Sequence, residues 1–553
     1  MRWRNTADYF IVMKPVRDPV RDALKKGVDL LIVGGGINGA GVFRDAAMRG
    51  LSVGLIEKND FGWGTSSRSS KLIHGGVRYL EHMEFGLVLE SSIERTLLSR
   101  LMPDLVQPAP FVIPVYQGDR HGLFVMDLGL WLYDLFAFFR NFHLHRRLNR
   151  KAIRALLPEL KEKGLKGGVL YYDCRVNDAR LVINNVVSGM AHHGLALNYT
   201  QAVRVKKENG RVTVVTARDA LSGEIFDIPC NVLISAAGPW SNGFYPLVEG
   251  QPRQLLRLTK GIHLMFHRKK FKTEAALVIT SNDDRRLVFV IPWEEYTLVG
   301  TTDTDFDGDP DHVYSEKEDV AYLLRLVNGY FPGLDLKPSD AISAFAGLRP
   351  LLLSRGSASS VSRKDKIVKG PSGAYYIGGG KLTTYRHIAQ KAVDKAVRDL
   401  SPEKRAAALK CRTDREPLIS KPEGLNCLGP ARLRDAGLQN DTLDYLCARY
   451  GRGSLEIIEL AASDKALSER ISPELPFVYA EIPYGVKHEM LLTVTDFFRL
   501  RTEIFLKAAD NGCSVLDKAA ALLARALDLT DAERERQINE YRAYLDRNLS
   551  CLS

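Results

Sequence analysis

Apolar and polar residues follow a regular order in residues 29–57, DLLIVGGGINGAGVFRDAAMRGLSVGLIE. The apolar runs 30–33 and 51–56 each predict a buried strand, because they are short and continuous. Between them, apolar residues recur at helical spacing and predict a helix that ends at Gly50. The segment is therefore predicted to form a strand, a tight turn, a helix and a second strand, which is the arrangement of a nucleotide-binding unit.

The predicted turn carries Gly34, Gly36 and Gly39 in a GxGxxG pattern, and Glu57 ends the second strand. Glycines at these places permit a tight turn, let the backbone approach a pyrophosphate and let the helix pack closely on the strand. The helix N-terminus offers N–H groups to phosphates, and Glu57 is placed to accept hydrogen bonds from a ribose. The pattern predicts a dinucleotide cofactor without separating NAD from FAD. The alternative, a glycine-rich turn without a ligand, is disfavoured by the flanking strands and the acid.

Apolar periodicity predicts further strands and helices up to residue 403, and several strands alternate like an antiparallel sheet inserted into the first unit. The predicted helices are 178–194 and one that begins after residue 384, and the predicted strands are 196–205, 211–216, 232–236, 261–266, 287–292, 296–302 and 375–379. The last strand runs into a second glycine-rich turn, Gly378-Gly379-Gly380. The helix after this turn would direct a second N-terminal dipole at the same anionic cofactor.

The C-terminal part of the chain has a different pattern. Residues 404–430 are polar and contain several prolines and glycines, and therefore predict a linker. Beyond the linker, apolar spacing predicts a separate helical domain. Its predicted helices are 441–450, 455–467, 488–507, 515–527 and 531–549.

The composition is that of a soluble globular protein of two or three domains: 553 residues, 45% hydrophobic and 26% charged. The formal net charge of +11 favours anionic partners, such as a phosphorylated substrate or an acidic membrane surface. Nucleic acid is not expected, because the chain has no motif for it. The seven cysteines are scattered without a CxxC pair. This usage predicts a reducing compartment, with no metal site and no disulfide framework.

The N-terminus predicts no signal peptide, and no segment predicts a transmembrane helix, so we expect a cytoplasmic protein. Residues 1–28 hold seven Lys or Arg and three Asp. They predict a solvated basic extension, with a membrane-surface helix as the alternative.

Residues 122–139 are the most apolar window of the chain, but Asp127 and Asp134 interrupt it on one predicted helix face. Two central acids argue against a membrane span. The residues that follow form a basic cluster: Arg140, His143, His145, Arg146, Arg147, Arg150 and Lys151. The window therefore predicts either a monotopic membrane contact or a buried helix beside a solvated basic turn.

Residues 59–82, NDFGWGTSSRSSKLIHGGVRYLEH, are rich in Gly and Ser and carry Arg68, Lys71, His74 and Arg78. Small hydrogen-bond donors on a loose backbone suit the wrapping of an extended anionic cofactor. A loop of this length without helical periodicity is more often functional than an ordinary surface loop.

Seven motifs occur in order between residues 30 and 386: GGGINGAG, TSSRSSKLIHGGVRYLEH, SAAGPW, KGIHLMF, IPWEEYTLVGTTDT, FAGLRPLL and GGGKLTTYR. Together they closely resemble the FAD-dependent (aerobic, respiratory) glycerol-3-phosphate dehydrogenases of the D-amino-acid-oxidase-like flavoprotein superfamily. The later stretch EIPYGVKHEMLLTVTDFFRLRTEIFL resembles the helical domain of that family. The resemblance thus covers all of the chain except residues 1–27.

The resemblance implies an α/β fold with a Rossmann-like FAD-binding domain over 28–403. An antiparallel β-rich substrate domain is expected as an insertion at about 100–160 and 250–350. An all-α domain is expected over 431–553.

The resemblance also implies that FAD is bound noncovalently and that sn-glycerol 3-phosphate is oxidised to dihydroxyacetone phosphate by hydride transfer to FAD. Electrons would pass to membrane quinone, from a peripheral position on the inner face of the cytoplasmic membrane, and homodimers are expected. An oxygen-using glycerol-3-phosphate oxidase is the nearest alternative. More distant alternatives are an amine-oxidising flavoprotein and a flavin-binding membrane scaffold without turnover.

The motifs and the resemblance assign the cofactor contacts to the two glycine-rich turns, the Ser-rich loop and single positions on later strands. These residues are Gly34, Gly35, Gly36, Asn38, Gly39, Glu57, Thr65, Ser66, Ser67, Ser69, Ser70, Lys71, His74, Val203, Gly238, Gly379, Gly380, Lys381, Leu382 and Thr383.

The phosphate dianion of the implied substrate requires a cationic pocket. The residues that match the family motifs around substrate are Arg78, Tyr79, Arg349, Lys381, Thr383 and Thr384. A guanidinium can hold a phosphate through two parallel hydrogen bonds, which a lysine cannot. For any one of these cations, a structural ion pair is the alternative.

Two histidines are candidates for the base that takes the hydroxyl proton, because histidine titrates near neutral pH. His263 is on a predicted strand that the resemblance places near the flavin, and His74 is in the Ser-rich loop. Either ring could instead hydrogen-bond the cofactor or the loop. Arg349 is expected to take part in catalysis by stabilising the developing alkoxide.

Overall fold

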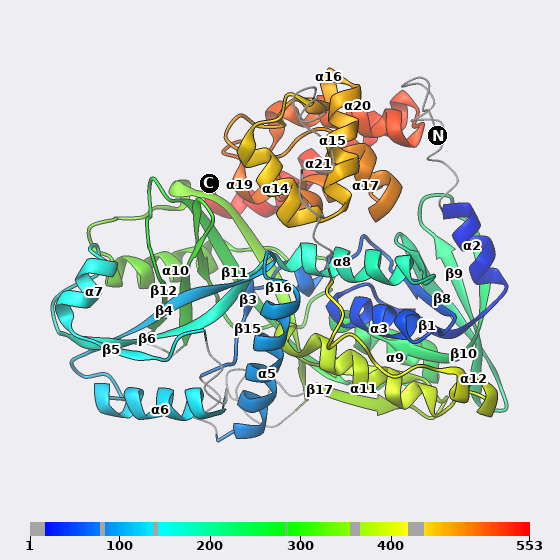
Figure 1. Ribbon diagram of the computed structural model, residues 1–553, viewed down its shortest axis with the longest axis horizontal. Coiled ribbons are helices and arrows are strands. Elements are labelled where there is room, and N and C mark those ends of the chain that lie inside the picture. Colours follow the sequence, from blue (N-terminus) through cyan, green and yellow to red (C-terminus); the bar gives the residue numbers. More distant parts are fainter. Residues whose placement is uncertain are drawn as a thin grey trace.

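The computed structural model describes residues 17–77, 83–136, 142–281, 284, 286–353, 365–418 and 436–553. Figure 1 shows two β-sheets side by side, each with its own helices. The C-terminal helices, in orange and red, form a layer across the top of both.

A mostly parallel sheet forms the nucleotide-binding part. Its order is β17-β18-β10-β1-β2-β7, with β17 antiparallel at the edge and the other neighbours parallel. β8 and β9 extend β10 as an antiparallel ribbon. The strands are β1 (Val28–Val33), β2 (Val53–Ile56), β7 (Leu195–Leu197), β8 (Thr200–Glu208), β9 (Arg211–Asp219), β10 (Ile225–Ser235), β17 (Asp365–Lys369) and β18 (Tyr375–Gly379). Every residue of β1 is buried, as expected for a strand covered on both faces.

The helix predicted after the first glycine-rich turn is present and packs between two others, as Figure 1 shows. The helices of this part are α3 (Ile37–Met48), α8 (Asp178–Ala191), α9 (Ser241–Glu249) and α11 (Tyr385–Val397). The predicted strand–turn–helix–strand unit is therefore confirmed, and so is the helix predicted over 178–194, although it ends three residues earlier.

A second sheet lies beside the first, in the order β15-β11-β14-β13-β12-β4-β6-β3, with β16 paired to β11 and β5 to β6. All of its pairs are antiparallel except β12 with β4. The strands are β3 (Leu72–Ile73), β4 (Val106–Tyr116), β5 (Arg146–Leu148), β6 (Leu165–Val176), β11 (Leu256–His267), β12 (Ala276–Thr280), β13 (Leu287–Trp293), β14 (Tyr296–Gly300), β15 (Thr304–Asp305) and β16 (Ala341–Leu352). The antiparallel pairing predicted for β11, β13 and β14 is confirmed.

The helices around this sheet are α5 (Phe85–Leu101), α6 (Leu123–Phe136), α7 (Arg150–Leu156) and α10 (Lys317–Tyr330). On α6, Asp127 and Asp134 share a face as predicted, because both carboxylates reach His145, at 3.4 and 2.7 Å. The other side of α6 is exposed and apolar. Its exposed side chains are Phe124, Val125, Leu128, Trp131, Leu132 and Leu135.

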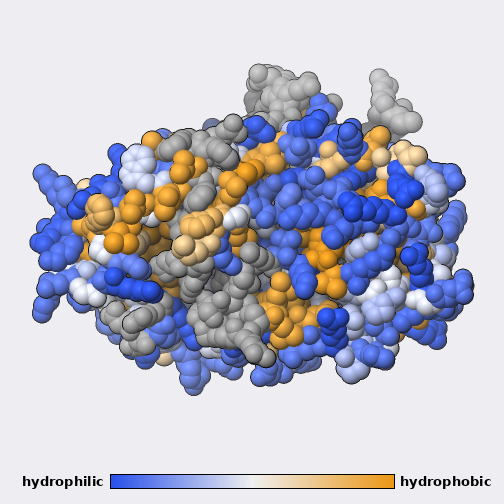
Figure 2. Space-filling model, turned by 90° about the horizontal axis from the view of Figure 1, so that it is seen from below, coloured by the Kyte–Doolittle hydropathy of each residue, from blue (hydrophilic) through white to orange (hydrophobic). Residues whose placement is uncertain are grey.

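Figure 2 looks at the molecule from below and shows hydrophobic side chains gathered over α6, on the left. A fully buried helix, one of the two alternatives for this window, is therefore not what forms. The described part of the chain contains no helix long and apolar enough to cross a membrane.

The C-terminal part is helical, as predicted. Its elements are α14 (Asn440–Tyr450), α15 (Gly453–Ser463), α16 (Lys465–Ser468), α17 (Glu481–Glu489), α18 (Val494–Asp496), the π-helical turn η7 (Phe497–Arg501), α19 (Ile504–Lys507), α20 (Leu516–Leu527) and α21 (Asp531–Leu549). The single helix predicted over 488–507 is wrong. Met490 and Glu503 adopt left-handed backbone angles, with φ of 51° and 61°, and these break the segment into short pieces.

The helical domain is not separate from the rest of the chain. Its apolar residues share one core with the second sheet, for example Phe505 with Trp293. Buried ion pairs also join it to the nucleotide-binding part, including Arg501 with Asp60 at 2.6 Å.

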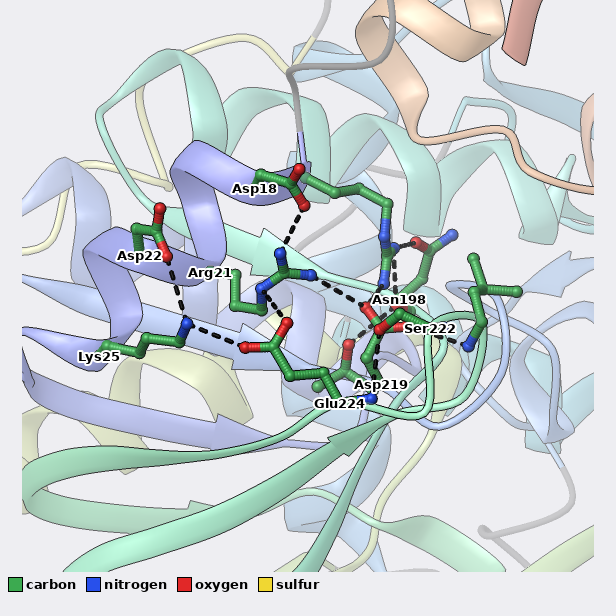
Figure 3. A network of polar contacts seen from close by, with 11 residues as sticks. Asp18, Arg21, Asp22, Lys25, Asn198, Asp219, Ser222 and Glu224 are labelled. Atoms are coloured by element: carbon green, nitrogen blue, oxygen red, sulfur yellow. Dashed lines mark hydrogen bonds and ion pairs between the residues drawn. The ribbon is translucent and has the colours of Figure 1, made fainter. Parts of the chain in front are cut away.

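Residues 17–25 form the helix α2 (Arg17–Lys25), which packs against β7 and β10 of the first sheet. Figure 3 shows the polar contacts that its side chains make with Asp219 and Glu224. Arg17 bonds to Asp219 at 2.7 Å, and Lys25 pairs with Glu224 at 2.9 Å. Leu24 is fully buried. For these residues the predicted solvated extension is wrong, because basic side chains meet acids of the fold, and the membrane-surface alternative stays a prediction. Residues 1–16 lie outside the described part.

The first residues of the predicted linker are also packed on the fold. α12 (Pro402–Ala407) is followed by Leu409, whose N–H donates to the carbonyl of Arg49, and Leu418 is buried. Residues 404–418 are therefore part of the folded surface, and 419–430 lie outside the described residues.

Candidate active site

A cavity of about 1560 Å³ lies between the two sheets. Its wall includes the residues that follow β1 and β10, the turn after β18, and side chains of the second sheet such as His263 and Arg349. Ligands of open α/β sheets bind at the carboxyl ends of the parallel strands, so the cavity is where the nucleotide-binding unit would place its cofactor.

Gly34 and Gly39 meet the steric requirements that the sequence predicts for the first turn. Gly34 has a φ of +110°, and a Cβ there would lie 2.5 Å from the carbonyl oxygen of Ala236. A Cβ on Gly39 would lie 1.8 Å from the carbonyl oxygen of Gly34. The turn and the close helix packing therefore both require glycine.

Glu57 closes the same turn. Its carboxylate accepts the N–H of Gly35 at 2.6 Å and that of Asn59 at 2.9 Å, and it lines the cavity. Burial raises the pKa of Glu57, and the two N–H donors oppose that shift. Each carboxylate oxygen keeps a further lone pair for a ribose hydroxyl.

The N-terminus of α3 faces the cavity beside the Ser-rich loop. Ser66 Oγ accepts the N–H of Ile37, in the first turn of the helix, at 2.9 Å. The Oδ1 atom of Asn38 is buried and has no hydrogen-bond partner among the described residues. A helix N-terminus with an unpaired polar atom fits a pyrophosphate-bearing cofactor.

The loop after β2 divides into residues that face the cavity and residues that do not. Thr65, Ser66, Ser69 and Ser70 line it, and their contacts with the cofactor stay a prediction. Ser67 and Lys71, also predicted as cofactor contacts, face the C-terminal helices instead. Ser67 Oγ accepts from Arg499 at 3.1 Å, and Lys71 is fully buried in an ion cluster.

The second glycine-rich turn reaches the cavity through Gly379, Gly380, Lys381, Leu382 and Thr383. Lys381 Nζ donates to Ser91 Oγ at 3.1 Å. Thr383 Oγ1 accepts the N–H of His74 at 3.0 Å, so this turn and the Ser-rich loop are joined directly. Gly238 also lines the cavity, whereas Gly35, Gly39, Val203 and Thr384 do not.

His263 lies on β11 in the cavity wall, with 3% of its surface exposed. Its Nε2 is 2.8 Å from Ser70 Oγ, and its ring stacks on Phe345 at 4.9 Å. Nδ1 has no hydrogen-bond partner among the described residues. Burial, followed by the charges of Arg349 and Lys71, lowers the pKa of His263 to about 3, so the ring is neutral near neutral pH.

Arg349 lies beside His263, because β16 pairs with β11 and Gly261 leaves room for the guanidinium. The guanidinium donates to Asp303 at 2.9 Å and to Thr301 Oγ1 at 2.7 Å. Asp303 and Thr301 also line the cavity, and neither was expected at the site from the sequence. The only signal for them was the TTDT motif within the family resemblance.

Arg78 and Tyr79 lie outside the described residues, and their substrate contacts remain predictions. The described site therefore brings His263, Arg349 and Lys381 around one cavity with the nucleotide-binding turn. A neutral base and two cations on the walls of a cofactor cavity suit the oxidation of an anionic alcohol.

Comparisons with known proteins also indicate an FAD-binding protein. Residues 29–392 match the family profile described as FAD dependent oxidoreductase, and residues 411–534 match the C-terminal domain of alpha-glycerophosphate oxidase. An aerobic glycerol-3-phosphate dehydrogenase of Staphylococcus haemolyticus is 34% identical over 93% of this chain and 94% of its own length. A glycerol-3-phosphate dehydrogenase of a Synechocystis species is 35% identical over 94% of this chain and 96% of its own.

A solved structure of a glycerol-3-phosphate dehydrogenase from Bacillus halodurans, complexed with FAD, superposes with a TM-score of 0.79 and 29% identity. The match covers 96% of this chain and 97% of that one. The expected fold class is thereby confirmed, and so is FAD as the cofactor. The chain belongs to the FAD-dependent glycerol-3-phosphate dehydrogenase family.

Proposed function

We propose that this chain oxidises sn-glycerol 3-phosphate to dihydroxyacetone phosphate and passes the electrons to a membrane quinone. The observation that carries the proposal is the meeting of His263, Arg349 and Lys381 in the wall of the FAD cavity. Bound FAD supplies the hydride acceptor for C2 of the substrate.

His263 takes the hydroxyl proton in this proposal. A neutral imidazole is ready to accept a proton without first losing one. Its low pKa makes it a weak base, but the hydroxyl becomes much more acidic as the C2–H bond weakens, so a weak base suffices. We assign this role to His263, whose ring lies in the cavity wall near Arg349 with Nδ1 unpaired among the described residues, and His74, which also lines the cavity, is the alternative.

Arg349 and Lys381 supply positive charge to the substrate. The phosphate dianion and the developing alkoxide both require it, and Asp303 fixes the direction of the Arg349 guanidinium. Arg78 and Tyr79 are proposed to complete the phosphate site. An amine substrate would instead need a site for its carboxylate, and a scaffold would have no use for a neutral base beside two cations.

The exposed side of α6 supports a membrane contact and a quinone acceptor. Val125, Leu128 and Leu132 belong to the exposed apolar face and also line the cavity. A lipid-soluble acceptor could therefore pass from the membrane to the cavity along one apolar helix. Nearby exposed cations favour anionic lipids. They are Arg146, Arg147, Arg150 and Lys151.

The acceptor is tested by comparing turnover with a short-chain quinone analogue against turnover with oxygen, with sn-glycerol 3-phosphate as substrate. We expect fast quinone reduction and little peroxide. Stoichiometric peroxide with slow quinone reduction would identify a glycerol-3-phosphate oxidase instead. The proposed homodimer and the position at the inner membrane face await separate measurement of mass and of lipid binding.

A further inference from the structure

The C-terminal helical domain meets the Ser-rich loop next to the base. We propose that this domain positions the base: Glu503 and Asp178 together hold Lys71, and Lys71 sets the loop that presents Ser70 to His263. The inference rests on the proposed function, in which His263 takes the substrate proton.

The clamp around Lys71 is a buried ionic cluster. Lys71 Nζ lies 2.7 Å from Asp178 Oδ1 and 2.9 Å from Glu503 Oε1, and Lys507 Nζ lies 3.5 Å from Glu503 Oε2. The Lys71 and Asp178 side chains have no exposed surface, and that of Glu503 is 1% exposed. Trp293 closes the cluster, with its ring centre 4.9 Å from the ammonium. Charges buried this deeply are stable only in a well-defined geometry, so the cluster specifies where Lys71 sits.

The backbone is constrained at both Glu503 and Lys71. Glu503 has a left-handed φ of 61°, between the π-helical turn η7 and α19. Lys71 has a left-handed φ of 55°. Non-glycine residues in this region need surroundings that hold them there. The ion pair between Glu503 and Lys71 helps to hold both residues in this backbone conformation.

The constraint on Lys71 reaches Ser70 directly. The N–H of Lys71 donates to Ser69 Oγ at 3.0 Å, and Ser69 Oγ donates to Asp178 Oδ2 at 2.7 Å. Ser70 therefore lies between two residues that the same Asp178 carboxylate holds. Its hydroxyl is then left to meet His263 Nε2 at 2.8 Å.

The Ser70 contact selects the form of the His263 ring. A neutral imidazole carries one N–H. If Nε2 holds the hydrogen, it donates to Ser70 and leaves Nδ1 as a bare acceptor. If Nδ1 holds it, a buried N–H has no acceptor among the described residues, which is unfavourable. Ser70 thus favours the tautomer in which Nδ1 can accept the proton. If the loop moved Ser70 away from Nε2, this preference for one tautomer would be lost.

The structure offers a matched control for the clamp. Glu489 of the helical domain pairs with Arg180 of α8 at 2.6 Å, and the two side chains are 1% and 3% exposed. This pair also joins the helical domain to the nucleotide-binding part, but within the described residues neither of its side chains bonds to residues 69–71. Losing its charge should therefore cost a similar amount of stability without moving Ser70.

The test uses the FAD-loaded wild type and the variants Glu503→Gln, Glu489→Gln, Ser70→Ala and Ser70→Thr. The rate constant of flavin reduction by sn-glycerol 3-phosphate is measured anaerobically from pH 6 to pH 9, together with FAD content and Tm. We expect E503Q and S70A to slow reduction roughly tenfold or more and to shift its pH dependence in the same direction. S70T should recover most of the rate, and E489Q should lose Tm but keep the wild-type pH profile.

A double variant distinguishes action through Ser70 from general loosening. If Glu503 acts through Ser70, E503Q should add little to the effect of S70A on the pH profile, because the link is already broken. Additive effects, or an E503Q profile that matches E489Q, would overturn the proposal.

A failure of the proposed function can be distinguished from a failure of the clamp. If sn-glycerol 3-phosphate does not reduce the wild-type flavin, that function is wrong. The clamp is then judged by the ring ¹⁵N shifts of labelled His263. These shifts should change in E503Q and stay fixed in E489Q, and equal shifts in both variants would refute the clamp.

Discussion

The exposed apolar face of α6 is predicted to bind a membrane surface, and the affinity lost on its substitution can be estimated from the structure. Phe124 is 74% exposed and Leu135 is 50% exposed, and neither lines the cavity. Full burial of such a side chain stabilises by about 1.5–3 kcal/mol. The exposed fractions of the two residues therefore correspond to about 2–4 kcal/mol if a lipid surface covers them. Since about 1.4 kcal/mol is a factor of ten, the double variant Phe124→Ser with Leu135→Ser should bind vesicles roughly 30-fold to several hundredfold more weakly.

The assay is flotation with vesicles of mixed anionic and neutral lipid, run beside activity with a soluble electron acceptor. A matched control replaces Ile225 and Leu409 with serine, because these are 60% and 53% exposed but belong to the nucleotide-binding part. We expect the α6 variant to lose flotation, to keep its Tm and to keep soluble-acceptor activity. Unchanged flotation, or an equal loss in the control, would refute the membrane role of α6.

Three further predictions concern the site and the N-terminus. Arg349→Ala should slow flavin reduction by roughly 100-fold or more while FAD stays bound; loss of FAD on purification would make the residue structural instead. Gly39→Ala should lower the FAD content sharply, because its Cβ would meet the carbonyl of Gly34, whereas Gly243→Ala, with open space at the Cβ, should not; equal FAD contents by absorbance would contradict this. Removal of residues 1–26 should lower the Tm measured by calorimetry, because it deletes the ion-paired helix α2, and an unchanged Tm would show that α2 adds nothing to the fold.

The parts of the fold that could be predicted from sequence are those with strong local patterns. The unit over 29–57 carries its own turn, packing and strand signals, and all of them are present in the structure. The helix predicted over 531–549 has the same bounds in the structure, because Thr530 and Glu533 form a capping box that marks its start.

The errors lie where distant contacts decide local structure. The helix predicted over 488–507 is broken at Glu503, whose carboxylate reaches Lys71, 432 residues away in the chain. No local pattern indicates such a partner. The same holds for residues 17–25. Their basic side chains predict exposure to solvent, but in the structure they form ion pairs with Asp219 and Glu224, which are distant in sequence.

The residues proposed to contact the substrate could be predicted from sequence, but the residues that hold them in place could not. The family motifs named His263, Arg349 and Lys381, and the structure places all three on the cavity. They did not show that Asp303 fixes the direction of Arg349, because sheet pairing and not sequence spacing brings the two together. For the same reason, Lys71 was assigned to the cofactor although its ammonium belongs to the interface with the helical domain.

The central claim is that this site transfers a hydride from sn-glycerol 3-phosphate to bound FAD. Its most direct test is to mix the purified FAD-loaded protein with that substrate anaerobically and to follow the oxidised-flavin absorbance near about 450 nm. The account predicts rapid and complete bleaching with the sn-3 substrate, and a loss of bleaching when phosphate is absent from the alcohol. Bound flavin that stays oxidised in the presence of excess substrate would contradict the account, even though the fold and the family would stand.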